Sequence, residues 1–595
     1  MNNLPKWDLS PLYLGIEDNN ISRDIEILEK KTKDFAKNYN GFISDMHADG
    51  LYIAISEYEI IENISTKLYT FAFLQYVTDL TNENVVAFLQ KIKDKLTDIS
   101  TNLTFFSLQI NNLSDEDFDK LIKQDGKISQ YVDYLKNIRR FKKHNLSNEI
   151  ENLIINKDSS GISQIIRLFD EHSARLKFNI DGKSLNLSAA IELLSSGSGD
   201  MRKNAAGEIS KVFGENAWFY GIILNTVAKD KSIDDNLRYY KSPISSRNLS
   251  NFIEDDVVEC LINSVKSRYP QISHRYYKLK AKLMNKEFLE YYDRNAPISV
   301  ADDKIFTFDQ AREIVLDSYY GFNEEIGKIV ESFFANKLID AEPSPFKMSG
   351  AFCHPNATEH NPYIMLNYFG KTRDVSTMAH ELGHGVHMQL SRKCGQLMQH
   401  APLTLAETAS LFGEQLVFER LLKTSISDKE KIAILSNKIE DSINTVIRQI
   451  SFCDFENTIH KERARGELTT SKISSIWLET QRDSLGEYVK LSNEYSNYWC
   501  YVSHFIHAPF YVYSYAFGNL LVNSLYNCYK NEKVQNFSTK YIELLSSGGK
   551  VHHSDALKPF GLNAKDQDFW LSGLSLIEKL IDDLEFIVNK NENRV

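Results

Sequence analysis

The residues with the clearest chemical potential are His380, Glu381 and His384, which stand in the segment His-Glu-Leu-Gly-His. Two histidines four residues apart lie one turn apart on the same face of a helix. Their imidazole nitrogens can therefore bind one Zn²⁺ ion at about 2.0–2.1 Å. Glu381 lies about 100° around that helix from His380, where it can reach a water at the metal without taking a ligand position. Because zinc acidifies such a water, the segment predicts hydrolysis of a carbonyl compound with Glu381 as general base.

The surrounding sequence predicts the helix that this spacing requires. Apolar residues recur at close to helical spacing, at Val375, Met378, Ala379, Leu382, Val386 and Leu390. Asp374 or Ser376 can cap the N-terminus, and Gly395 lies beyond the C-terminal end. Gly383 weakens a helix unless close packing or close approach to the metal requires it. The alternative is a surface helix that carries two unrelated histidines.

A catalytic zinc site needs three protein ligands and an open position. Leu390 stands where the metzincin pattern requires histidine, so that class is excluded. Glu407 is the predicted third ligand, although Thr404 and Glu407 also fit a capping box, in which Glu407 would only hold the start of its own helix. Glu414 shares the face of Glu407 and is either a hydrogen-bond partner of a ligand histidine or a solvated glutamate. We expect His387 to be packed or hydrogen-bonded rather than a fourth ligand.

Four separated segments of the chain agree, in order, with one known family. They are Trp7-Asp-Leu-Ser-Pro-Leu-Tyr13, then Gly350-Ala-Phe-Cys353 with Pro362-Tyr-Ile-Met-Leu-Asn-Tyr368, then the histidine segment with Ala406-Glu-Thr-Ala-Ser410, and Phe510-Tyr-Val-Tyr-Ser-Tyr-Ala-Phe-Gly518. The chain resembles the thimet-oligopeptidase family of zinc peptidases, and most closely its bacterial oligoendopeptidase F branch. The resemblance covers nearly the whole length. It implies that His380, His384 and Glu407 bind zinc and that Glu381 is the general base.

The resemblance also implies a histidine and tyrosines that stabilise the oxyanion and hold the substrate backbone. On that basis the chain offers catalytic residues at His507, Tyr511 and Tyr515, and substrate-binding residues at Gly350, Ala351, His504 and Tyr513. If Pro509 begins a helix, His504 and His507 lie in the loop before it. At helical spacing His507, Tyr511 and Tyr515 share a face, whereas Tyr513 points elsewhere. The alternative is an aromatic stripe in the core.

An extended run at 363–368 precedes the histidine segment. If this run lies near the zinc, it could present a strand edge to which a peptide substrate adds by main-chain hydrogen bonds. Such bonds do not depend on the substrate's side chains, so peptides of varied sequence would be accepted. The competing interpretation is a buried structural strand.

Composition places the chain among ordinary globular proteins. It has 595 residues, of which 42% are apolar and 25% charged, and a net charge of −11, which argues against a general nucleic-acid binder. The N-terminus lacks the pattern of a signal peptide, and no apolar run reaches the length of a membrane span. The six cysteines show no C-x-x-C spacing, which suits reduced thiols and a cytoplasmic location.

The chain is mostly helical by pattern, with long amphipathic stretches at 21–40, 83–111 and 115–137. Residues 178–187 predict a β-hairpin through Asp181-Gly182, and 345–370 is the best β segment near the histidines. We place a domain boundary at the Ser/Gly stretch 195–199, with an N-terminal helical domain at 1–195 and a zinc peptidase domain at 196–595. The family fold implies a mainly α protein, with two helical halves around a deep substrate channel and a small β-sheet near the zinc site.

These observations predict a zinc-dependent endopeptidase that hydrolyses internal bonds of short unfolded oligopeptides and binds one Zn²⁺ per chain. The alternatives are a zinc exopeptidase, either a carboxypeptidase or a dipeptidyl carboxypeptidase, and a catalytically silent peptide-binding scaffold. Co²⁺ or Mn²⁺ could occupy such a site instead of zinc. We expect short peptides as partners, no nucleic acid or membrane, and a monomer or weak oligomer.

Overall fold

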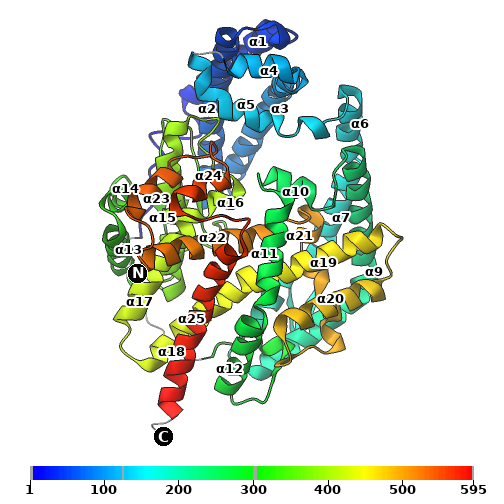
Figure 1. Cartoon of the computed structure of the whole chain (residues 1–595), viewed down its shortest axis with the longest axis vertical. Helices are drawn as coiled ribbons and strands as arrows, with labels where there is room; N and C mark the ends of the chain where they lie inside the picture. The colour runs from blue at the N-terminus through cyan, green and yellow to red at the C-terminus, as the bar shows by residue number, and fades with distance from the viewer. Residues whose placement is uncertain (1–3, 124–125, 299–304, 593–595) are drawn as a thin grey trace. The chain divides into compact units, whose positions relative to one another are not determined.

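The computed structural model describes residues 4–123, 126–298 and 305–592, and the described chain is mainly helical (Figure 1). It divides into two compact units, each assembled from three segments. Unit 1 comprises Met1–Lys142, Lys304–Lys423 and Val534–Phe560, and unit 2 comprises Lys143–Asp303, Thr424–Lys533 and Gly561–Val595. The mainly α class is confirmed. The substrate channel between two halves and the domain boundary at 195/196 stay predictions.

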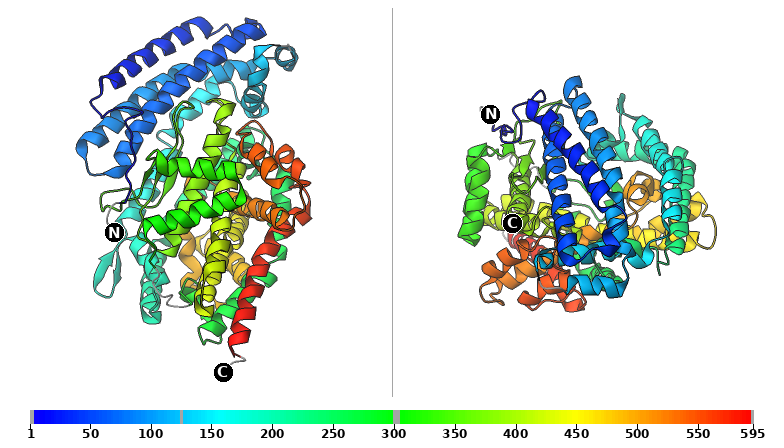
Figure 2. Two further views of the ribbon diagram at one scale, coloured as in Figure 1. Left: turned by 90° about the vertical axis from the view of Figure 1, so that its left-hand side faces the viewer. Right: turned by 90° about the horizontal axis from the view of Figure 1, so that it is seen from above.

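Unit 1 contains the histidine segment. Its helices are α1 (Asn19–Tyr39), α2 (Ala48–Thr78), α3 (Glu83–Asn112), α4 (Asp115–Ile122), α5 (Val132–Arg139), α13 (Phe308–Phe322), α14 (Glu324–Ala335), α15 (Thr372–Ser391), α16 (Leu403–Ala406), α17 (Thr408–Thr424), α23 (Phe537–Leu545) and α24 (His553–Leu557). The first three pack side by side (Figure 2). The amphipathic stretch predicted at 115–137 forms two α-helices, α4 and α5, with the 3₁₀ segment Lys127–Tyr131 before α5. Gly126, immediately before that segment, has φ +145°, a conformation open mainly to glycine.

A three-stranded sheet in unit 1 packs against α15. Its order is β4 (Ile339–Asp340), β6 (Tyr363–Met365), β5 (Phe352–His354), with β4 parallel and β5 antiparallel to β6. The prediction of a small sheet beside the zinc helix is confirmed. β6 is the central strand and is fully buried, so of the two interpretations of 363–368 the buried structural strand is the one that the structure supports. β5 forms an edge of the sheet, and its residues are half-buried.

Unit 2 holds the tyrosine-rich late segment. Its helices are α6 (Asn148–Asp158), α7 (Ile162–Arg175), α8 (Leu187–Glu192), α9 (Gly199–Leu237), α10 (Ser245–Ser250), α11 (Asp255–Ser267), α12 (Arg275–Leu283), α18 (Asp428–Ser442), α19 (Arg448–Arg463), α20 (Thr470–Leu485), α21 (His504–His507), α22 (Tyr513–Lys530) and α25 (Gln567–Glu592). The long α25 packs along α18 and α22 (Figure 1). Among the described residues no helix is long and apolar enough to cross a membrane.

Two strand pairs complete unit 2. β1 (Phe178–Ile180) and β2 (Lys183–Leu185) form the predicted hairpin, in which Asp181 and Gly182 both have positive φ, as a primed turn requires. β3 (Leu289–Glu290) pairs in parallel with β7 (Val489–Lys490). The Ser/Gly stretch at 195–199 leads directly into α9, where the Ser198 side chain accepts a hydrogen bond from the Met201 amide.

A buried ammonium group ties the sheet of unit 1 together. Lys347 Nζ contacts the Asp340 carboxylate and donates to the carbonyl oxygens of Glu342 at 3.0 Å and of Leu366 at 2.8 Å. Both ionised side chains are almost completely buried. Because Asp340 lies on β4 and Leu366 follows β6, this one side chain links two strands.

Replacing Lys347 with Met should destabilise the protein by about 3–5 kcal/mol, because the Asp340 carboxylate would stay buried without its counter-charge. Denaturant unfolding measures the change. Lys328→Met is the matched control, since its partner Glu324 is largely exposed, and it should cost less than about 1 kcal/mol. Equal losses in the two variants would contradict a structural role for the buried pair.

Candidate active site

The histidine segment lies on α15, as predicted, but the helix begins earlier than either proposed cap. It starts at Thr372 with Lys371 as the N-cap residue. The Asp374 carboxylate, at the third position of the helix, accepts hydrogen bonds from the backbone amides of Lys371 at 3.0 Å and Phe369 at 2.8 Å. It therefore caps backbone N–H groups that precede the helix. The helix therefore holds His380, Glu381 and His384 well inside its regular part.

Gly383 lets α17 pack directly against α15. A Cβ atom at Gly383 would lie 2.4 Å from the Ala409 carbonyl oxygen and 2.5 Å from Ser410 Cα. On the other helix, a Cβ at Gly413 would meet the Tyr319 hydroxyl at 1.8 Å, and that hydroxyl donates to the Ala379 carbonyl at 2.7 Å. The glycine between the two histidines is thus required by backbone-to-backbone packing.

The predicted ligand atoms converge on one point. His380 Nε2 and His384 Nε2 are 3.1 Å apart, and Glu407 Oε2 lies 3.5 Å and 3.4 Å from them. A tetrahedral zinc ion with bonds near 2.05 Å places its ligand atoms about 3.3 Å apart. The three side chains are half-buried, and their nitrogen and carboxylate donors are those that zinc prefers. The residues present therefore fit a catalytic zinc site.

Glu407 occupies a break between two helices. α16 ends at Ala406 and α17 begins at Thr408. The Glu407 carboxylate accepts the Ser410 hydroxyl at 2.6 Å, which helps to hold it toward the histidines. α16 begins at Leu403 after Pro402, so Glu407 is not at the third position of a helix capped by Thr404. The geometry favours the ligand over the capping box.

Glu414 is a partner of a ligand histidine, the first of the two alternatives left open by the sequence. Its Oε1 lies 2.5 Å from His380 Nδ1. This contact favours a proton on Nδ1 and directs Nε2 toward the other two predicted ligand atoms, as a metal-binding histidine requires. Burial alone lowers the pKa of His380, but the hydrogen bond and charge of Glu414 outweigh it and raise that pKa to about 9. His387 is buried, and burial lowers its pKa to about 4, which agrees with a packed, neutral side chain.

Glu381 connects α15 to the edge strand β5. The side chain is buried, and burial raises its pKa to about 7, partly offset by the His380 charge and by a hydrogen bond from the Cys353 amide. A carboxylate with this pKa can both accept and return a proton near neutral pH. The same burial, together with the Glu381 charge, raises the pKa of the Cys353 thiol. The sequence motif identified Glu381 but contained no signal for this backbone contact.

Gly350 and Ala351, the predicted substrate-binding residues of unit 1, lead into the edge strand β5. Gly350 has φ +86°, and its carbonyl accepts the Asn367 side chain at 2.9 Å. This conformation directs the chain into β5 beside Glu381. A peptide-binding role for this edge stays a prediction.

The late segment of unit 2 differs from the single helix predicted after Pro509. His504–His507 form the short helix α21, Phe510 adopts φ +61°, and α22 begins only at Tyr513. A left-handed residue cannot continue a helix, so Tyr511 lies in the connection. The shared face predicted for His507, Tyr511 and Tyr515 is therefore not helical.

The structure brings His504, Tyr511 and Tyr515 together. The His504 and Tyr515 side chains are 3.2 Å apart between Nε2 and the hydroxyl, and both tyrosine rings contact the imidazole and each other. His507 instead pairs with Asp170 of α7 at 2.7 Å. Tyr513 is fully buried, and its hydroxyl accepts the Asn251 amide at 2.8 Å. Burial and this bond indicate a structural role for Tyr513, and its substrate-binding role lacks support.

Glu456 holds the backbone that carries Tyr511, and the sequence analysis missed it. Its Oε1 accepts the Phe510 amide at 2.8 Å, while Oε2 is buried without a hydrogen-bond partner. Burial raises the pKa of Glu456 to about 8, although the Phe510 amide and the charges of Arg247 and Lys231 lower it in part. Glu456 and Phe510 are 54 positions apart, so no local pattern could have linked them.

Comparison with known proteins identifies one family over most of the chain. The model described as peptidase family M3 matches residues 193–576, and a model described as oligopeptidase F matches residues 109–178. The chromosomal oligoendopeptidase F of Lactococcus lactis subsp. cremoris is 26% identical, with 98% of this chain and 97% of that protein covered. An oligoendopeptidase F homolog of Borreliella burgdorferi is 28% identical, with 95% of each chain covered.

Solved structures share the fold. A crystal structure from Chlamydophila abortus aligns with a TM-score of 0.85 at 24% identity over 98% of both chains. Oligoendopeptidase-F from Enterococcus faecium aligns with a TM-score of 0.72 at 21% identity, over 96% of this chain and 99% of that one. At these identities the likeness concerns the fold.

Gly383→Ala should lower both stability and metal content, because the new Cβ cannot coexist with the Ala409 carbonyl at the present helix separation. A loss of about 1–3 kcal/mol is expected from such overpacking. The matched control is Gly207→Ala on α9, where nothing lies within 4 Å of a Cβ, and it should stabilise by up to about 1 kcal/mol. Thermal unfolding and metal analysis of both variants check the result. Full metal content in Gly383→Ala would contradict the packing requirement.

Glu456→Gln should stabilise the protein increasingly as pH rises from about 4.3 to about 8. In this window the folded state keeps a proton on Glu456 that the unfolded chain has released, so the stability of the wild type falls with pH. The amide of glutamine mimics the protonated acid and removes that dependence, a gain of about 1–4 kcal/mol at the upper end. Denaturant unfolding at both ends of the window tests the prediction. Glu467→Gln, which alters an exposed glutamate, serves as the control. If the stability of wild type and of Glu456→Gln changed with pH in parallel, the prediction would be wrong.

Proposed function

Since this chain belongs to peptidase family M3 and is a metallopeptidase of its oligopeptidase F branch, we propose that it is a zinc endopeptidase for short unfolded peptides. One zinc ion per chain is held by His380, His384 and Glu407. The observation that carries this proposal is the convergence of three ligand atoms within 3.5 Å of one another beside the buried Glu381.

Zinc, when bound, supplies a Lewis acid that polarises the scissile carbonyl and acidifies a water. The chain supplies the proton transfers and the positioning. Glu381 accepts the proton of the attacking water and returns it to the leaving amine, and its pKa near 7 suits both steps. Glu414 orients His380 through Nδ1. The residues of β5, preceded by Gly350 and Ala351, offer main-chain hydrogen bonds to an extended peptide.

The oxyanion donors of this proposal come from the late segment. Tyr511 and Tyr515 remain the proposed catalytic tyrosines, and the cluster in unit 2 adds His504 to them through its contact with Tyr515. Phenol and imidazole groups can donate a hydrogen bond to the oxygen on which charge develops. His507, the histidine first assigned this role, is engaged by Asp170, so we place His504 ahead of it. All six cysteines are free thiols, which supports a reducing cytoplasmic location.

The test is cleavage of an internally quenched peptide of about eight residues that is blocked at both ends, a length suited to a narrow site. Glu381→Gln should keep its metal and lose about 100- to 10,000-fold in kcat, the contribution typical of a general base. The control Glu324→Gln alters a largely exposed glutamate and should cleave at the wild-type rate. Chelation should abolish wild-type activity, and zinc should restore it.

Other results would change the assignment. Cleavage of unblocked peptides only, with metal present, would establish an exopeptidase. A protein that neither binds metal nor cleaves would be a peptide-binding scaffold.

A further inference from the structure

Unit 2 contains an enclosed cavity of about 120 Å³ that the peptidase chemistry does not use. Two apolar side chains, Ile191 and Leu194, line it. The other eight lining residues are two arginines, one asparagine and five tyrosines, among them Arg294, Arg448, Tyr495 and Tyr501. A water takes about 30 Å³ in the liquid, so the cavity has room for a few waters or one small ion.

The tyrosines reach this cavity because of an unusual helix. Residues Asn493–Tyr501 form the 3₁₀ helix η9. Side chains three apart eclipse one another in a 3₁₀ helix, so Tyr495, Tyr498 and Tyr501 lie on one face, and all three line the cavity. The arrangement is periodic in the sequence as Tyr-x-x-Tyr-x-x-Tyr.

The two arginines come from separate backbone features of the same unit. Arg294 follows the 3₁₀ turn η6 (Tyr291–Asp293), and its carbonyl accepts the buried Lys280 ammonium at 2.6 Å. Arg448 follows the π-helical segment η8 (Ile443–Ile447) that joins α18 to α19. Single π turns within long helices occur often at functional sites.

Neither arginine has a carboxylate partner among the described residues, although Arg294 is only 9% exposed. The Nε atoms of both are buried without a hydrogen-bond partner. Arg294 Nη1 reaches only the Tyr495 hydroxyl, at 3.4 Å, and Arg448 contacts the Tyr501 hydroxyl. Buried charges are ordinarily paired, so two uncompensated guanidinium groups in one cavity require an explanation.

The neighbouring carboxylates are already engaged by other groups. Asp293 pairs with Arg202 at 2.7 Å and with Lys286, while Glu440 pairs with Lys280 at 2.6 Å. Glu494 accepts the Tyr291 hydroxyl at 3.0 Å. Among the described residues, none of these three carboxylates forms a hydrogen bond or ion pair with Arg294 or Arg448.

The two arginines give the cavity an excess of hydrogen-bond donors. The Tyr495 and Tyr501 hydroxyls each accept from an arginine, which leaves their own protons to donate. The Nε–H groups of the same two arginines also have no partner, so the lining is positively charged and not fully hydrogen-bonded. Guanidinium forks match the geometry of oxygen anions and bind them in bidentate fashion.

We propose that this cavity binds a small oxyanion, a phosphate, sulfate or carboxylate group, between Arg294 and Arg448. The anion accepts hydrogen bonds from both guanidinium groups and from Tyr495 and Tyr501. All residues of this site belong to unit 2, none of them is a proposed peptidase residue, and the proposal does not depend on the proposed function. Its occupant neutralises the buried charge and stabilises unit 2.

The test uses the full-length protein, purified without phosphate or sulfate. Isothermal titration and thermal unfolding are followed with sodium phosphate, sodium sulfate, sodium acetate and sodium chloride at equal ionic strength. Wild type should bind one oxyanion and gain several degrees in Tm, because ligand binding to the folded state alone stabilises it. A response to phosphate and sulfate indicates a tetrahedral anion, and a response to acetate indicates a carboxylate.

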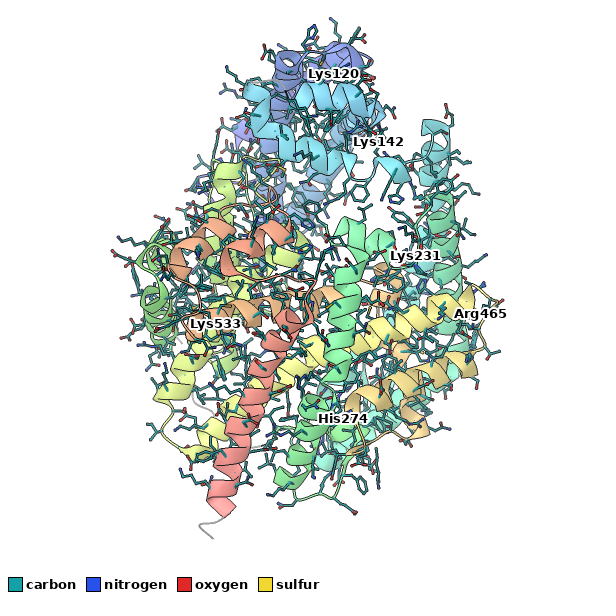
Figure 3. All side chains as sticks on the ribbon, viewed as in Figure 1. Lys120, Lys142, Lys231, His274, Arg465 and Lys533 are labelled. Atoms are coloured by element: carbon teal, nitrogen blue, oxygen red, sulfur yellow. The ribbon has the colours of Figure 1, made fainter. Side chains whose placement is uncertain are left out.

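Arg448→Met should weaken binding of the effective oxyanion by at least about tenfold, the loss of one charge-assisted pair. Tyr501→Phe removes one donor with no change of charge, and it should weaken binding less than Arg448→Met does. Arg465→Met is the matched control: this arginine lies on the exposed loop after α19 (Figure 3) and pairs with Glu462 at 2.7 Å. Its anion response should equal that of the wild type.

Two results would overturn the proposal. One is an equal response of wild type and Arg448→Met to every oxyanion. The other is a chloride effect as large as that of any oxyanion, which would indicate simple charge screening or a halide site.

Discussion

The close contact of α15 with α17 is the constraint on which the metal centre depends. At Gly383 the backbones approach so closely that no side chain fits between them. This approach carries Glu407 to the two histidines and Glu414 to the far side of His380. If the two helices were further apart, the Glu407 carboxylate could not bind the same zinc ion as the two histidines, because each ligand atom must lie about 2 Å from the metal. The small residues on both helices therefore act indirectly: they allow the helix separation that the metal site requires.

Burial of charge determines how several key ionisable side chains of the protein and their partners behave. Glu381 is buried beside one backbone amide, and this environment adjusts its pKa to the proton transfers expected of it. Glu456 is buried in the same manner but holds the Phe510 amide, so its task is to shape the backbone. In unit 1, the carboxylate partner of Lys347 lies within reach. In the part of the chain that the structure describes, Arg294 and Arg448 have no such partner, and the proposed oxyanion would compensate their charge.

The two compact units divide the chemistry between them. Unit 1 holds the proposed zinc ligands, the proposed general base and the edge strand, all on or against α15. Unit 2 holds the histidine and tyrosine cluster, its supporting glutamate and the arginine cavity. Each unit is built from three separate segments, so mutations at distant positions of the chain affect the same site.

The sequence by itself determined what depends on local backbone geometry. A spacing of four residues sufficed for His380 and His384, because every helix brings such residues to one face. The hairpin at Asp181-Gly182 and most helices followed from equally local signals. Only the tertiary structure decided which of two roles Glu407 and Glu414 take, that β5 rather than β6 forms the edge, and that His504 rather than His507 joins Tyr515. These outcomes depend on packing between segments tens to hundreds of residues apart, which periodicity within one segment does not encode.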